Sequence, residues 1–176
     1  MFRFGDTFLT TDADVETLVF DWGSVRMLSE EKVTGSQSVS FGHVLLNPGK
    51  GHERHNHPDA DEIIYFIKGK GMQMLNDGEP VHCTGGECCW IPKGVYHSTI
   101  NSGDGVLELV VAYMPAGAEQ VLRTLPGVRI LPPASSRKPT GQLHDRTRDP
   151  PATMGRLQPP DRRRPRRPAD PWRSDD

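Results

Sequence analysis

The chain has 176 residues, a formal net charge of −2 and 25% charged residues. Ten of its 16 prolines lie after Leu131, and the charge balance changes at the same point. Residues 1–131 carry 10 Lys and Arg against 17 Asp and Glu, whereas residues 132–176 carry 11 against 6. We therefore expect one domain over residues 1–131 and a separate tail over residues 132–176. The acidic charge of the domain argues against nucleic acid as its ligand.

Membrane insertion and disulfide stabilisation are both disfavoured by the sequence. Residues 1–6 lack a cationic segment followed by an apolar run, and no apolar window approaches the length of a membrane span. The three cysteines, Cys83, Cys88 and Cys89, form no C-x-x-C pair and are too few for a disulfide framework. We expect a soluble, cytoplasmic protein with reduced thiols.

Short runs of β-forming residues alternate with turn signals through the domain, a pattern typical of an all-β sandwich or barrel. Residues 18–20 and 25–28 flank a turn and predict a hairpin. Apolar residues at helical spacing over residues 116–125, followed by Pro126 and Gly127, predict one short closing helix. Further strands are predicted over residues 39–46, 63–67, 72–75 and 106–113.

Two imidazoles and a carboxylate lie close together within residues 49–69. His55 and His57 are two residues apart, so on an extended strand both side chains leave the same face, and Glu62 begins an apolar run that can lie alongside. Further along, a Pro-x-Gly turn precedes His97 at the start of another predicted strand. Three neutral imidazoles and one carboxylate suit one divalent ion of iron, manganese, nickel, cobalt, copper or zinc.

These two segments resemble the two signature motifs of the cupin superfamily. The first motif, G-x5-H-x-H-x4-E-x6-G, and the second, G-x5-P-x-G-x2-H-x3-N, are matched at all ten positions, and the motif core covers about residues 38–115. One copy of each motif is typical of a single-domain cupin. The matching residues are Gly49, His55, His57, Glu62 and Gly69, then Gly86, Pro92, Gly94, His97 and Asn101.

The resemblance implies a double-stranded β-helix, which is a jelly-roll barrel, with a small-molecule substrate and a homodimeric assembly. It also implies that His55, His57, Glu62 and His97 are the metal ligands. A looser similarity around residues 54–58, 62–65 and 115–118 points to polyketide cyclases and related tailoring enzymes.

Three other roles are left open by the residues. Glu62 either remains an anionic ligand or acts as a base when it leaves the metal. His43 either points into the barrel near the metal, as a catalytic donor or proton carrier, or faces solvent. His52 is interpreted as a loop residue on the approach to His55.

Two classes of function remain. The first is a metal-dependent enzyme for a small oxygenated metabolite, with either cyclase or isomerase chemistry or dioxygenase chemistry. The second is a non-catalytic cupin that binds a small molecule as a sensor or carrier. A sugar-phosphate isomerase is a third option, but it predicts basic residues at the barrel mouth, where Arg54 and Lys93 are the main candidates.

The tail is rich in arginine and proline and poor in aliphatic residues. Such a segment buries too little apolar surface to offset its conformational entropy, so we expect residues 132–176 to be disordered. A solvated tail, a site for an acidic partner or nucleic acid, and an altered 3′ end of the gene are all compatible with this composition.

Overall fold

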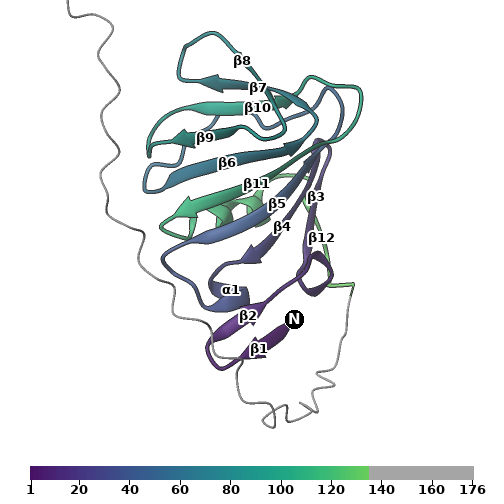
Figure 1. The fold of residues 1–176 in the computed structure, drawn as a ribbon, viewed down its shortest axis with the longest axis vertical. Helices are drawn as coiled ribbons and strands as arrows, with labels where there is room; N and C mark the ends of the chain where they lie inside the picture. Colours follow the sequence, from purple (N-terminus) through teal and green to yellow (C-terminus); the bar gives the residue numbers. More distant parts are fainter. Residues whose placement is uncertain (135–176) are drawn as a thin grey trace, which may run out of the picture. The chain divides into compact units, whose positions relative to one another are not determined.

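The computed structural model describes residues 1–134 of the chain. These residues are arranged mainly as β-strands in two principal sheets and a small hairpin (Figure 1). The all-β fold class predicted from the sequence is therefore confirmed. The predicted disorder of the tail falls almost entirely outside the described residues. That expectation and the domain boundary after residue 131 therefore stay predictions.

The larger sheet runs in the order β12-β3-β4-β5-β11-β6-β9, and each neighbouring pair is antiparallel. The β3–β4 pair is the hairpin predicted around residues 21–24. The strands of this sheet are β3 (Thr17–Phe20), β4 (Gly23–Ser29), β5 (Ser40–Leu46), β6 (Asp61–Lys68), β9 (Cys88–Ile91), β11 (Leu107–Met114) and β12 (Arg129–Leu131).

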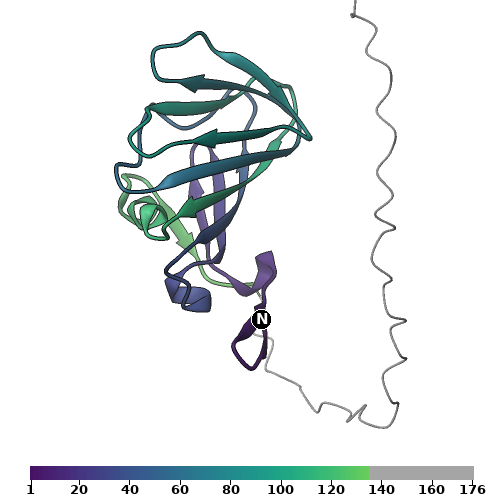
Figure 2. The ribbon, with the colours of Figure 1, turned by 60° about the vertical axis from the view of Figure 1, so that its left-hand side comes forward.

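The smaller sheet contains β7 (Lys70–Leu75), β8 (Val81–Thr84) and β10 (His97–Asn101) in the order β10-β7-β8. After β6 in the larger sheet, the chain forms β7 and β8 in the smaller sheet, β9 in the larger, β10 in the smaller and β11 in the larger, and such repeated crossing between two sheets is typical of a jelly roll. Isolated bridges from Gly51 to Ile100 and from His55 to His97 attach the β5–β6 loop to β10. Figure 2 shows the strands of both sheets curving around a common interior.

The remaining elements are short. The closing helix predicted over residues 116–125 is a 3₁₀ helix, η2 (Ala118–Thr124), rather than an α-helix, as is common for helical segments of one or two turns. No helix in the described part of the chain is long and apolar enough to cross a membrane. The other short elements are β1 (Phe2–Phe4), β2 (Thr7–Leu9), η1 (Asp12–Asp14) and α1 (Glu31–Thr34).

The core lies between the two sheets and is built from alternate residues of their strands. In β11 every second residue is buried, namely Leu107, Leu109, Val111 and Tyr113. Alternation also directs Val44 and Leu46 of β5 inward. The same inward face carries the polar residues of the candidate site, so the packing that stabilises the barrel also positions that site.

Gly69 shows why the first motif ends in glycine. It joins β6 to β7 with φ of +103°, a value that favours glycine. A Cβ atom at this position would lie 2.9 Å from Leu107 Cα and 3.0 Å from the Val106 carbonyl oxygen. Both the backbone conformation and the close approach of β11 therefore require glycine at this turn.

Candidate metal centre

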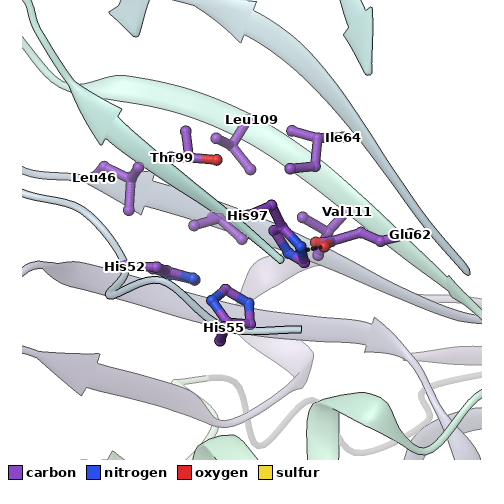
Figure 3. Close-up of a pocket in the computed structure, with 10 residues that line it drawn as sticks. Leu46, His52, His55, Glu62, Ile64, His97, Thr99, Leu109 and Val111 are labelled. Carbon is purple, nitrogen blue, oxygen red and sulfur yellow. Dashed lines mark ion pairs between the residues drawn. The ribbon is translucent and has the colours of Figure 1, made fainter. Parts of the chain in front are cut away.

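Four side chains predicted as metal ligands lie together inside the barrel. Glu62 comes from β6, His97 from β10, and His55 and His57 from the loop between β5 and β6. Each offers one ligand atom, and these atoms all lie within 4.8 Å of one another. Figure 3 shows the side chains of His55, Glu62 and His97 directed toward the same space. Their role as metal ligands remains a prediction.

The loop that carries His55 and His57 is fixed against β10. The backbone N–H of His55 donates to the carbonyl of His97 at 3.0 Å, and the N–H of His97 donates back to His55 at 2.8 Å. The expectation that both histidines lie on a regular strand was wrong, because only this isolated bridge forms. The bridge nevertheless places two imidazoles from distant parts of the chain side by side, with ring centroids 4.4 Å apart.

The Pro-x-Gly turn of the second motif holds the other side of the site. Gly94 has φ of +78°, and its N–H donates to the His57 carbonyl at 2.8 Å. The side-chain amide of Asn56 donates to the Gly94 carbonyl at 3.2 Å. The N–H of Lys93 donates to Asp61 Oδ1, next to Glu62, at 2.9 Å. The turn therefore connects His57 to the start of β6.

Backbone carbonyls set the orientation of two imidazoles. His55 Nδ1 lies 2.8 Å from the Glu53 carbonyl oxygen, and His97 Nδ1 lies 2.9 Å from that of Val95. A carbonyl oxygen only accepts, so each Nδ1 carries the proton that it donates. In the neutral ring the lone pair is then on Nε2, which is the arrangement of a histidine prepared to bind a metal.

The ligand atoms lack other partners. His97 Nε2 and His57 Nε2 lie 2.8 and 3.4 Å from Glu62 Oε2, within ion-pair distance. All three atoms are buried, and none makes a hydrogen bond of acceptable geometry. Buried polar atoms without partners are costly, and a cation between the nitrogen lone pairs and the carboxylate would satisfy them together. The residues therefore fit a divalent transition-metal ion or zinc.

Protonation of the site reflects the competition between burial and these contacts. Burial alone would raise the pKa of Glu62, but the adjacent imidazoles of His57 and His97 outweigh it and lower that pKa to about 2. Burial lowers the pKa of His55. For His97 the effect of burial is outweighed by Glu62, so its pKa is raised. The carboxylate is thus held in its anionic, metal-binding form.

A cavity of about 20 Å³ adjoins three of the four side chains, those of His55, Glu62 and His97. One water molecule needs ~10–15 Å³ on the same measure, so only a small group fits beside the site. Besides three of the four ligand residues, two polar residues line it, His52 and Thr99, and none of the ten lining residues is Lys or Arg. The rest of the wall is aliphatic: Val44, Leu46, Ile64, Leu109 and Val111.

The structure does not bring His43 into this site. Its neighbour in β5, Val44, lines the cavity, so strand alternation directs His43 to the outer face of the sheet. There its Nδ1 lies 2.9 Å from Asp12 Oδ2 and its Nε2 lies 3.1 Å from Glu108 Oε1. The outward orientation is the second of the two alternatives expected for this residue.

Two residues near the site were not singled out as functional by the sequence. His52, interpreted as a loop residue, lines the cavity with its Nε2 buried and without a partner, and burial lowers its pKa to about 4. Tyr113 of β11 packs edge-on against His57, with ring centroids 4.9 Å apart, and burial raises its pKa. Neither belongs to a spaced motif, and both are identified by tertiary packing alone.

The fold and the site define the class of protein. Residues 42–113 match the family model described as "Cupin domain". A solved structure, an oxalate decarboxylase–formate complex from Lactobacillus farciminis, is similar with a TM-score of 0.54 and 25% identity, over 59% of this chain and 32% of that chain. Residues 42–113 therefore form a cupin domain, as the motifs indicated.

Three curated relatives are similar over part of the chain. The "Polyketide synthase CurC" of Streptomyces cyaneus is 27% identical over 93 residues, covering 53% of this chain and 60% of the relative. The glucose-6-phosphate isomerase of Thermococcus kodakarensis is 33% identical over 130 residues, which cover 63% of this chain and 65% of the relative. The oxalate-binding protein of Thermotoga maritima is 29% identical over 85 residues, which cover 48% of this chain and 69% of the relative. The chain thus spans less than two thirds of the first two relatives.

Proposed function

We propose that this protein is a metal-dependent cupin enzyme that acts on a small oxygenated metabolite. The observation that carries the proposal is the convergence of buried imidazole nitrogens and a carboxylate oxygen that have no hydrogen-bond partner. Their positions are fixed by backbone contacts from two separate motifs, so the arrangement is preorganised rather than assembled on binding. Relatives with enzymatic names support the same class of function.

His55, His57, His97 and Glu62 would hold the ion. A bound divalent ion would polarise a substrate oxygen and stabilise developing negative charge, and a redox-active ion would also permit chemistry with dioxygen. Most of the cavity wall is aliphatic, so a bound substrate meets few polar groups there besides the ligand residues, His52 and Thr99. Glu62 acts as a ligand and, where it is displaced, is the nearest carboxylate that could accept a substrate proton.

Two reaction types follow from this site. Cyclase or isomerase chemistry by enolisation needs no redox change, and the similarity to a protein named as a polyketide synthase supports it. Activity should then survive replacement of the native ion by zinc. Dioxygenase chemistry requires a redox-active ion and molecular oxygen, so strict anaerobiosis should abolish it. Assays of oxygen uptake with diketones and phenolic polyketides separate the two.

A non-catalytic function is the alternative, and the similarity to an oxalate-binding protein supports it. A sensor or carrier would bind its small molecule at the same cluster and release it unchanged. Isothermal titration followed by mass analysis of the recovered ligand tests this directly. Tight reversible binding without conversion favours the binding module over the enzyme.

The name of one relative supports a sugar-phosphate isomerase, but the residues that line the cavity do not. A phosphate group requires cations or a cluster of N–H donors, and none of the ten cavity-lining residues is Lys or Arg. The guanidinium of Arg54 pairs with Asp77 at 2.8 Å and packs over Tyr96 instead. We therefore place a non-phosphorylated substrate ahead of a sugar phosphate.

The variant His57→Ala tests the enzyme proposal. It removes one ligand, so the protein should lose both its metal and its turnover. His82→Ala, in the exposed part of β8, is the matched control and should retain both. Retention of full metal content by His57→Ala would contradict the proposed ligand set.

A further inference from the structure

His52 is a polar residue of the cavity. It lies between Gly49 and His55, at a position where the first motif specifies no residue type. Its ring Nε2 is buried and has no hydrogen-bond partner, although the side chain lines the cavity beside the four-residue cluster. Figure 3 shows the ring pointing toward the space in front of His55 and His97. The ring centroids of His52 and His55 are 5.8 Å apart, and His52 is not part of the group of mutually close ligand atoms. His52 is therefore positioned to contact a small molecule bound in the cavity rather than to coordinate the ion.

The position of His52 is fixed by its surroundings. Its backbone N–H donates to the Thr99 carbonyl at 3.1 Å. The preceding Gly51 lies so close to β10 that a Cβ atom there would be 2.1 Å from the same carbonyl oxygen, so glycine permits this approach. On the other side the imidazole packs on Trp22, with centroids 4.0 Å apart, and Trp22 stacks on the buried Phe20 at 4.3 Å. The ring is supported on both sides while Nε2 stays without a partner.

We propose that His52 is a specificity-determining residue whose Nε2 forms a hydrogen bond with an oxygen of a small ligand bound through another oxygen at the four-residue cluster. This inference rests on the proposed function, because it places the ligand at the metal centre. A buried ring nitrogen without a partner carries a desolvation cost, which such a hydrogen bond removes.

The same wall defines the chemical class of the ligand. The hydroxyl of Thr99 donates to Gln73 Oε1 at 2.6 Å, so Thr99 is available to the ligand mainly as an acceptor. The aliphatic side chains facing His52 suit a short carbon skeleton, and the absence of Lys and Arg among the lining residues disfavours a phosphate. These groups suit a compact molecule with at least two oxygens, such as a keto acid, a dicarboxylate or a diketone, of which only a small part enters the cavity.

The test uses the full-length protein loaded with Co²⁺ and oxalate as the probe. Co²⁺ affinity and oxalate affinity are measured separately, from the visible spectrum of the bound ion and by isothermal titration. The variant His52→Phe keeps a ring that can pack on Trp22 but cannot form the hydrogen bond, and His52→Gln keeps a hydrogen-bonding group. His82→Phe is the matched control for the same substitution at an exposed site.

We expect His52→Phe to bind Co²⁺ within about threefold of the wild-type affinity and to bind oxalate about tenfold more weakly, as expected for one lost hydrogen bond. His52→Gln should recover part of the oxalate affinity, and His82→Phe should match the wild type. Equal oxalate affinity in wild type and His52→Phe would overturn the inference, as would loss of Co²⁺ from His52→Phe or failure of the loaded wild type to bind oxalate. Failure of the wild type to bind Co²⁺ would instead overturn the proposed function.

Discussion

Glu62 is the residue on which the electrostatics of the site depend. It is buried, and its Oε2 faces the Nε2 atoms of His57 and His97. With its proton on Nδ1, the neutral His97 ring has no hydrogen to donate to this oxygen, whereas a bound cation would satisfy both atoms. The carboxylate therefore supplies the negative charge that makes a site of otherwise neutral ligands selective for a cation.

Glu62→Gln should show this dependence on charge. The amide keeps the shape of the side chain but removes its charge, so affinity for Zn²⁺ should fall by more than about tenfold. Competition with a chromophoric chelator measures the affinity. The matched control is Glu87→Gln, in the exposed turn before β9. Similar Zn²⁺ affinities for Glu62→Gln and the wild type would show that the carboxylate is not a ligand.

The three cysteines should differ in reactivity because only one is exposed. Burial raises the pKa of Cys83 to about 11 and also raises that of Cys89, so at about pH 8 few of these thiols are thiolates. Iodoacetamide should therefore modify Cys88 first, as followed by peptide mass spectrometry. Cys88→Ser should remove the fast phase, and equally fast labelling of Cys83 would contradict the described packing.

At the scale of elements, Arg123 connects η2 to the residues that flank β3 and β4. Arg123 Nε donates to Glu16 Oε1 at 2.6 Å, and its two terminal nitrogens donate to the carboxylate of Glu30 at 2.5 and 3.1 Å. Glu30 is only 2% exposed. Removing one member of such a buried pair leaves an uncompensated charge, which costs more than the pair itself contributes.

Arg123→Ala should accordingly lower the free energy of unfolding by about 3 kcal/mol. Urea denaturation measures the change. Arg129→Ala, at an exposed position of β12, should change it by less than about 0.5 kcal/mol. Replacing Glu30 by Leu together with Arg123 by Met should recover part of the loss. A loss below about 1 kcal/mol in Arg123→Ala would mean that the contact contributes little.

The elements predicted correctly from the sequence are those that bury one face. The β3–β4 hairpin and β11 show alternating burial, and alternation is the signal on which the predictions depended. By contrast, β1 and β12 are exposed along their whole length, so their sequences carry no such pattern. The sequence predicted the closing helix but not its 3₁₀ form, because apolar spacing over two turns does not distinguish a 3₁₀ helix from an α-helix.

The candidate site was predictable only where spacing carries the information. The four candidate ligands were named because their offsets match two motifs, and the structure brings them together. The place of His52 depends on its packing against Trp22, which belongs to a hairpin about 30 residues away in the chain, and no local pattern reports such a contact. The outward direction of His43 follows from which face of β5 packs inward, which the sequence left open.

At the scale of the whole molecule, the outer face of the large sheet carries exposed apolar side chains on two adjacent strands. Tyr65 and Ile67 of β6 are 43 and 42% exposed, and Trp90 of β9, which pairs with Ile63, is 61% exposed. Contiguous exposed apolar groups of this kind are typical of interaction surfaces. The homodimer expected from the sequence stays a prediction, and we expect this face to form its interface.

Trp90→Lys should therefore shift the protein from dimer to monomer, because it places a charge at the centre of the proposed interface. Sedimentation equilibrium measures the mass. Val81→Lys, at a position of β8 that is 59% exposed, is the matched control and should leave the mass unchanged. A monomeric wild type, or a dimer that tolerates Trp90→Lys, would contradict this interface.

Elemental analysis of the full-length protein purified without added metal tests the central claim most directly, beside the double variant His55→Ala/His97→Ala prepared in the same way. We expect about one ion of iron, manganese, nickel, cobalt, copper or zinc per wild-type chain and almost none in the double variant. Equal metal content in both proteins, or no metal in the wild type even after reconstitution, would contradict a metal centre at these four residues.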